Sequence, residues 1–272
     1  MIKKILKWIV SSVVGLFSLF ILYIYTYQES ILFQSEALVD NHKFSSPHDF
    51  KELFFSTEDG ARIHALHYQA KHPKGAVLYF HGRSGNLANY WDKFAGQFLE
   101  KNYDVIMMDY RSFGKSYGIL SEKNLLKDAE IIYNYANHHY QANQIVLYGC
   151  SLGTGIATYV ASKHDAKLLI LEAPYISILH LAHQQFAIIP KKILEFCVKY
   201  PLRTDRWIQQ VKIPIEIFHG KNDELIPYQH GEYLYSLAEK TTPTRFNLLV
   251  KGSHNNLSYQ EEYRNRLTTL LK

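Results

Sequence analysis

The distribution of hydrophobic and polar positions divides the chain into two parts. No residue between Trp8 and Tyr27 is charged, and a run of about twenty such residues can cross the hydrocarbon core of a bilayer as an α-helix. The run has no polar face, which a helix packed on a soluble core would show. From residue 50 onwards, short apolar runs alternate with amphipathic stretches. This second pattern predicts strands that alternate with helices.

The flanks of the apolar run favour an uncleaved membrane anchor over residues 1–28. Three lysines precede the run and three tyrosines cluster at its far end: Lys3, Lys4, Lys7, Tyr23, Tyr25 and Tyr27. The excess of positive charge places the N-terminus in the cytoplasm and the rest of the chain on the other side, which is the periplasm in a bacterium. A cleaved signal peptide is the main alternative, although its nearest cleavage site, Ser35-Glu36-Ala37, comes late. A buried core helix is the other.

Residues 29–49 are interpreted as a linker, and residues 50–272 as one α/β domain. Two strands around the turn Glu58-Asp59-Gly60 predict a hairpin. The continuously apolar run Ala76–Phe80 is typical of a parallel strand buried on both faces. Strands are expected at 50–57, 62–69, 76–80, 104–108, 144–148, 167–171, 213–218 and 245–250, and helices at 87–101, 123–138, 152–163, 229–239 and 258–271.

This alternation predicts a mostly parallel central sheet with helices on both faces and an antiparallel edge. The stretch from about 176 to 210 interrupts the alternation, because it carries two prolines and several aromatic residues where a single helix would suffice. We interpret it as a small helical cap. The alternative is a surface insertion without a role.

Composition narrows the function classes. The chain is 47% hydrophobic and 20% charged, which is typical of a globular protein. The net charge is +5, but no basic run is longer than a pair, so no nucleic-acid partner is expected. Neither of the two cysteines belongs to a CxxC pair, and no HExxH motif occurs. We therefore predict no metal site and no cofactor.

The segment Gly149-Cys150-Ser151-Leu152-Gly153 carries the strongest chemical signal. It follows an apolar strand and precedes a predicted helix, which is the context of a nucleophile elbow. The turn is too sharp for side chains on either side of the nucleophile, so glycine flanks it. Ser151 is therefore the predicted nucleophile.

A serine hydroxyl is a weak nucleophile at neutral pH and needs a base. His254, in Gly252-Ser253-His254, follows the last predicted strand and is chosen over the other histidines by its place in the chain. Asp223 follows the preceding strand and fits the order serine, acid, histidine. The alternative acids are Glu224 and Glu172; Asp109 comes too early.

An oxyanion needs two backbone N–H donors. Leu152, directly after the nucleophile, is the first predicted donor. Arg83, in the loop His81-Gly82-Arg83-Ser84-Gly85-Asn86, is the second. The Arg83 side chain either faces the pocket or is solvated, and His81 is interpreted as structural.

Together these motifs resemble the α/β-hydrolase fold family. The loop 80–86, the segment Asp109-Tyr110-Arg111-Ser112-Phe113-Gly114, the elbow, and the loops of Asp223 and His254 occur in family order. The chain is most similar to membrane-anchored single-domain hydrolases related to serine aminopeptidases, monoacylglycerol lipases and acyl-protein thioesterases. Arg83-Ser84 stands where that branch more often has Asn-Ala, and Ser112 stands where glycine is usual.

The resemblance implies a serine hydrolase with a Ser-His-Asp triad that acts on carboxylic ester or thioester bonds through an acyl-enzyme. The expected partners are a small-molecule acyl or ester substrate and, through the N-terminal helix, a membrane. The alternatives are a serine peptidase of the aminopeptidase type and a catalytically silent binding protein on the same fold.

Overall fold

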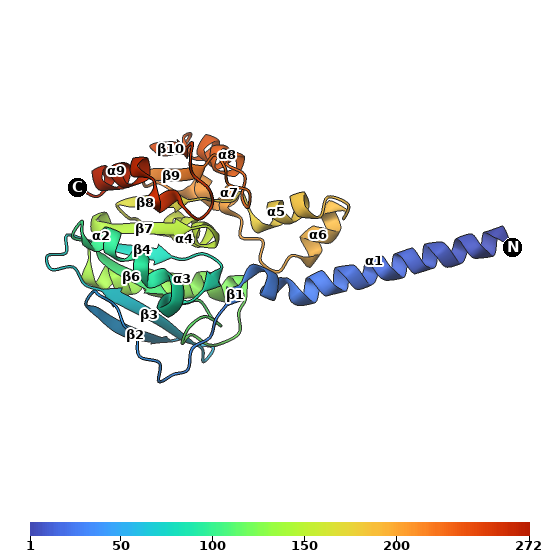
Figure 1. Ribbon diagram of the computed structural model, residues 1–272, viewed down its shortest axis with the longest axis horizontal. Helices are drawn as coiled ribbons and strands as arrows, with labels where there is room; N and C mark the ends of the chain where they lie inside the picture. The colour runs from blue at the N-terminus through green and yellow to red at the C-terminus, as the bar shows by residue number, and fades with distance from the viewer.

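A computed structural model describes all residues, 1–272, and its centre is an eight-stranded sheet (Figure 1). The strand order is β10-β9-β8-β7-β4-β6-β3-β2. Strands β2 and β3 form an antiparallel hairpin at one edge, and β3 also runs antiparallel to β6. All other neighbours are parallel. The strands are β2 (Phe50–Ser56), β3 (Arg62–Tyr68), β4 (Ala76–Phe80), β6 (Asp104–Met108), β7 (Ile145–Cys150), β8 (Leu168–Glu172), β9 (Ile215–Gly220) and β10 (Thr244–Leu249).

Helices cover both faces of this sheet. The continuously apolar sequence of strand β4 is explained by this arrangement, because both faces of the strand are buried. Ala76, Leu78 and Phe80 point into the larger hydrophobic core, under helices α3, α4 and α8, whereas Val77 and Tyr79 point into the smaller core with α2 and α9. Side chains alternate between the faces of a strand, so burial of both faces requires an apolar residue at every position. The covering helices are α2 (Gly96–Leu99), α3 (Glu122–His139), α4 (Leu152–Lys163), α8 (Gln229–Ala238) and α9 (Glu261–Leu270).

The expected fold class is confirmed, with one local correction. Residues 87–101 do not form a continuous helix; a π-helical turn (Leu87–Trp91) and a 3₁₀ turn (Asp92–Phe94) precede the short helix α2. The Trp91 indole N–H donates to the Ser84 carbonyl at 2.8 Å, and the Asn86 side chain accepts from the Asn89 amide. The Asn86 bond caps the first turn, as at any helix start, whereas the Trp91 bond ties this turn back to the preceding loop.

The stretch between β8 and β9 folds as a cap. It contains α5 (Ile178–Gln185), α6 (Lys191–Cys197), α7 (Thr204–Trp207) and a 3₁₀ turn at Ile208–Gln210. Helices α5 and α6 lie on the side of the domain from which α1 projects (Figure 1). Two large apolar side chains of this part, Ile188 and Phe196, are 86% and 87% exposed.

Helix α1 (Ile2–Leu32) is long and apolar enough to cross a membrane by length and composition. It continues four residues beyond the predicted anchor, and the residues after it are packed on the domain. Strand β1 (Gln34–Ser35) pairs with β5 (Ser84–Gly85) in a separate two-stranded parallel sheet, and Ala37 bridges to Gly114. The division into anchor, linker and domain stays a prediction, but the predicted linker is not an extended spacer.

Candidate active site

Ser151 lies at the turn between β7 and α4, where the chain reverses direction sharply. Its backbone has φ of +50° and ψ of −115°, a conformation that a residue with a side chain rarely adopts. A Cβ atom at Gly149 would lie 2.5 Å from the Gly153 carbonyl oxygen, and one at Gly153 would lie 1.9 Å from the Phe80 carbonyl oxygen. The two glycines therefore allow the strand and helix to approach, and the turn holds the serine hydroxyl out of the core.

The structure brings the three predicted triad residues together. His254 Nε2 lies 2.9 Å from Ser151 Oγ, and His254 Nδ1 lies 2.7 Å from Asp223 Oδ2. With its Nδ1 proton donated to the carboxylate, the imidazole presents an unprotonated Nε2 to the serine hydroxyl. The three side chains lie in the segments that directly follow the parallel strands β7, β9 and β10. Sites of open α/β sheets lie at this edge, beyond the carboxyl ends of the strands.

Asp223 is held as a carboxylate by its surroundings. Burial by itself would raise its pKa, but the hydrogen bond from His254 and the contact with His219, whose Nε2 lies 3.5 Å from Oδ2, hold the pKa well below its usual range. The other carboxylate oxygen accepts from the Leu225 and Ile226 amides at 3.0 and 2.8 Å. These bonds fix the position of the carboxylate behind the imidazole. The His219 contact is a feature that sequence reasoning did not identify.

The alternative acids occupy other positions. Glu172 is buried beneath the elbow, where it accepts a hydrogen bond from Tyr148, and burial raises its pKa. Glu224 is exposed at the wall of the pocket. Asp109 is buried and accepts from the Leu87 amide at 3.1 Å. None of these carboxylates is hydrogen-bonded to His254.

Two backbone amides are free to bind an oxyanion. The Leu152 N–H belongs to the first residue of α4 and has no acceptor in the protein, as expected at a helix N-terminus. The Arg83 N–H also donates to no protein acceptor. The ring of His81, just before this loop, is buried between Trp91 and Tyr110, and its Nδ1 lies 2.6 Å from the Gly82 carbonyl oxygen. His81 therefore supports the loop, as interpreted from sequence.

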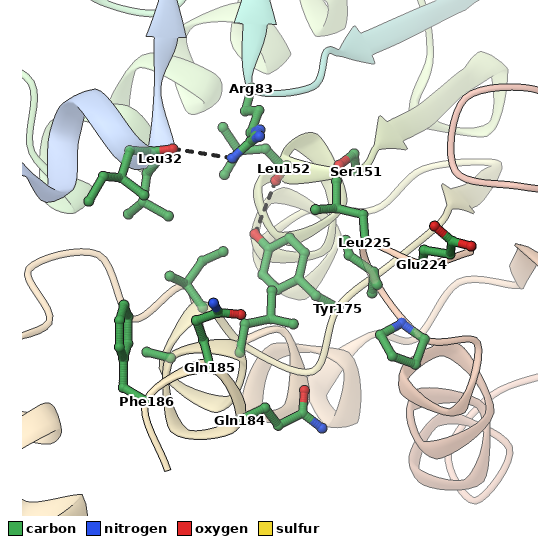
Figure 2. A pocket seen from close by; sticks show the side chains of 16 residues that line it. Leu32, Arg83, Ser151, Leu152, Tyr175, Gln184, Gln185, Phe186, Glu224 and Leu225 are labelled. Carbon is green, nitrogen blue, oxygen red and sulfur yellow. Dashed lines mark hydrogen bonds between the residues drawn. The ribbon is translucent and has the colours of Figure 1, made fainter. Parts of the chain in front are cut away.

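A cavity of about 540 Å³ opens from Ser151, a volume within the usual range of small-molecule sites. Ten of its sixteen lining residues are hydrophobic, so it suits an apolar ligand. The cap supplies one wall through α5, and the segment Glu224–Pro227 supplies another. In Figure 2, Ser151 and Leu225 lie at one side of the cavity, and Leu32 and Phe186 lie at the other.

Two further residues that line the cavity were not predicted from the sequence. Ile31 and Leu32, from the last turn of α1, line the cavity although their segment was interpreted as a linker. The Arg83 side chain also lines it and donates from Nη1 to the Ile31 carbonyl at 3.2 Å. The available signal was the apolar triplet Ile31-Leu32-Phe33, because a solvated linker has no need of three consecutive large apolar residues.

Comparisons with known proteins agree with this fold. The family model described as serine aminopeptidase, S33, matches residues 71–206, which is half of the chain. An uncharacterized protein of Acanthamoeba polyphaga mimivirus is 32% identical over 81% of this chain and 81% of its own length. The uncharacterized protein YfhR of Escherichia coli K12 is 31% identical, covering 76% of this chain and 74% of its own. A solved esterase of Pyrococcus furiosus superposes with a TM-score of 0.68 at 17% identity, over 88% of this chain and 97% of that one.

Proposed function

The chain belongs to the serine aminopeptidase S33 family of α/β-hydrolases, and we propose that it hydrolyses carboxylic ester or thioester bonds of acyl substrates through an acyl-enzyme. The observation that carries the proposal is the hydrogen-bonded chain from Ser151 Oγ to His254 to Asp223, at the mouth of an apolar cavity. This geometry matches a nucleophile with its base and the group that orients the base.

The proposed reaction has two halves. Ser151 Oγ attacks the substrate carbonyl carbon while His254 Nε2 takes the hydroxyl proton, and the resulting oxyanion accepts from the Arg83 and Leu152 amides. The leaving alcohol or thiol takes that proton from His254 as the tetrahedral intermediate collapses. Water, activated by the same imidazole, then attacks the acyl-enzyme and releases the carboxylic acid. Every proton transfer uses residues of this chain.

The lining of the cavity supports an acyl group as the part of the substrate that is recognised. Ile178 and Leu181 of α5, and Phe186 directly after it, present carbon atoms to the cavity beside Ser151. Burial of an acyl chain there is favourable by about 0.8 kcal/mol per methylene group. We therefore expect medium-chain esters to react faster than acetyl esters.

A second candidate, an aminopeptidase-type activity, rests on one observation. The exposed carboxylate of Glu224 lies at the cavity wall, where it could bind the free amine of a peptide N-terminus. The two activities separate in one assay, because a peptidase prefers an aminoacyl anilide to a medium-chain ester. Glu224→Gln would lower the anilide rate and leave the ester rate unchanged.

The test of the main proposal is labelling of the full chain by a fluorophosphonate probe. We expect wild type to label and Ser151→Ala to remain unlabelled, with its hydrolysis of a nitrophenyl ester reduced about 10⁵-fold or more. Circular dichroism of both proteins checks that the fold is intact. Retained turnover in purified Ser151→Ala would contradict the assignment, and an unlabelled wild type would favour a silent binding protein.

We further propose that α1 anchors the protein in a membrane with its N-terminus cytoplasmic and the catalytic domain on the opposite side. No residue of the apolar window of α1 is buried in the protein, and three lysines precede it; both observations support this arrangement. The exposed Ile188 and Phe196 would then face the bilayer. An alkaline phosphatase fused to the C-terminus should be active; an inactive phosphatase beside a fluorescent cytoplasmic reporter fusion would reverse the orientation.

A further inference from the structure

The C-terminal end of α1 contacts the cap through side chains whose hydrogen bonds require one fixed position of the helix relative to the cap. Gln28 is 7% exposed, its Nε2 donates to the Cys197 carbonyl at 3.0 Å, and its Oε1 accepts from the Lys199 amide at 2.8 Å. At the next residue of α1, Glu29 Oε1 accepts a hydrogen bond from the Tyr200 hydroxyl at 2.9 Å. A buried amide with both ends bonded to backbone is a specific attachment, because a shift of this turn would leave those groups without partners.

The residues directly after the helix contact the loop that carries the Arg83 amide. Phe33 is 5% exposed and packs edge-on against Phe113 and Tyr200. The Gln34 amide donates to the Arg83 carbonyl at 2.8 Å, and β1 then pairs with β5. The Arg83 guanidinium in turn donates a hydrogen bond to the Ile31 carbonyl. The segment 28–35 is thus held from the cap on one side and from the predicted oxyanion loop on the other.

Between these two attachments, Ile31 and Leu32 line the cavity, and Leu32 lies across it from Ser151 (Figure 2). Leu181 of α5 and Phe186 line the same cavity, so both are available to contact an acyl chain bound to Ser151 Oγ. Nearer the N-terminus of α1, Phe20 packs edge-on against Phe186, with ring centroids 6.2 Å apart. The far end of the cavity therefore lies where α1 leaves the domain.

We propose that the last turn of α1 is a wall of the acyl-binding site, and that Leu32 sets the length of acyl chain that the site accepts. This inference rests on the proposed hydrolase function and names the part of the substrate that reaches α1. It also requires the mature protein to keep residues 28–35. Cleavage after Ala37, the nearest signal-peptide site, would remove this wall and strand β1 together.

The test uses the full chain in detergent and compares Leu32→Trp with Leu22→Trp. Leu22 lies in the same helix and is 58% exposed, away from the cavity, so it controls for the added indole. We expect Leu32→Trp to lower kcat/KM for nitrophenyl octanoate relative to butyrate roughly tenfold or more, because a filled pocket rejects the longer chain. Leu22→Trp should leave this ratio within about twofold. Leu32→Ala should move the preference toward longer chains.

A small ethyl fluorophosphonate keeps the outcomes separate. Labelling of Leu32→Trp at the wild-type rate shows an intact triad, and an unchanged octanoate to butyrate ratio in that protein would overturn the inference. If Leu32→Trp does not fold, Leu32→Ala decides the question by the same ratio. If wild type hydrolyses neither ester, the hydrolase proposal fails, and the wall is then tested by binding of cis-parinaric acid to full-length wild type and to the two tryptophan variants. Equal affinity in all three would overturn the wall.

Discussion

The nucleophile elbow and the junction between α1 and the cap are two parts of one site, built in different ways. The elbow is a run of neighbouring residues from β7 into α4, and its contacts leave no room for an added carbon atom at Gly149 or Gly153. At the junction, the side chain of Gln28 bonds to Cys197 and Lys199, which follow it in the chain by 169 and 171 residues. The junction lies at the edge of the open cavity. The comparison indicates that the strained turn at Ser151 is encoded locally, whereas the shape of the cavity beside it depends on how distant segments meet.

This difference also separates what each region tolerates. A change at the elbow meets backbone atoms that cannot move, so its cost falls on folding and catalysis together. A change at the junction meets an open cavity and a partly exposed helix, so its cost falls on the shape of the cavity. The cap can therefore vary in sequence while the triad remains in place, which suits a fold that serves many substrates.

The largest expected effect sharpens the catalytic side of the comparison. We expect Asp223→Asn to lower kcat about 10⁴-fold, because asparagine stabilises the wrong imidazole tautomer and cannot stabilise the imidazolium. Glu172→Gln should change kcat only slightly, since Glu172 is bonded to Tyr148 and not to His254. Steady-state hydrolysis of a nitrophenyl ester measures both. A greater loss in Glu172→Gln would move the acid to the end of β8.

Folding gives the next largest effect. Gly153→Ala should destabilise the protein by about 3 kcal/mol or more, because its new carbon would collide with backbone oxygens of Phe80 and His81. Gly15→Ala is the matched control; it has nothing within 4 Å of the added carbon and lies in a helix that favours alanine. Thermal unfolding in detergent compares the two. Equal melting temperatures would mean that the elbow is not as tightly packed as described.

The junction should break without disturbing the triad. Gln28→Ala removes two hydrogen bonds to the cap, which should favour local opening by about 1–3 kcal/mol. Hydrogen exchange at the Lys199 amide would then accelerate, while fluorophosphonate labelling of Ser151 stays near the wild-type rate. Thr26→Ala is the control, because Thr26 is exposed and bonds only within α1. A parallel loss of labelling would show that the two regions are coupled.

The smallest effect concerns pH and the contact of the cap with α8. His230 accepts from the Ile176 amide at 3.2 Å, and its Nε2 lies 3.0 Å from Gln184 Oε1. Burial, followed by the nearby His180 and His219, lowers the pKa of His230 from its ordinary value of 6.5 to about 4. The unfolded chain therefore takes up this proton first as pH falls, and stability present above pH 6.5 is lost between 6.5 and about 4.

His230→Asn should flatten that loss by a few degrees in melting temperature, since asparagine can still accept from the Ile176 amide and does not titrate. The measurement is the melting temperature of both proteins at pH 7, 5.5 and 4.5. The same slope in both would assign the loss to other groups. Ser151 labelling at pH 7 should not differ between them.

The sequence by itself determined the fold class, because period-two and helical patterns follow from local backbone geometry. It also predicted which serine, histidine and aspartate to examine, since each follows a strand in a fixed order and parallel strands end at one edge. It failed at residues 87–101, where the Trp91 indole donates to the Ser84 carbonyl of the preceding loop and shorter turns replace a regular helix.

Only the tertiary structure decided what lies opposite the nucleophile. Gln28 reads as an ordinary polar residue after an apolar helix, and its partners, Cys197 and Lys199, follow in the chain after most of the domain. Likewise, nothing in the pattern of Ile31 and Leu32 says which cavity their side chains line. Periodicity indicates which face of a helix or strand is buried, but not which distant segment covers that face. That choice depends on the packing of α1 against the cap.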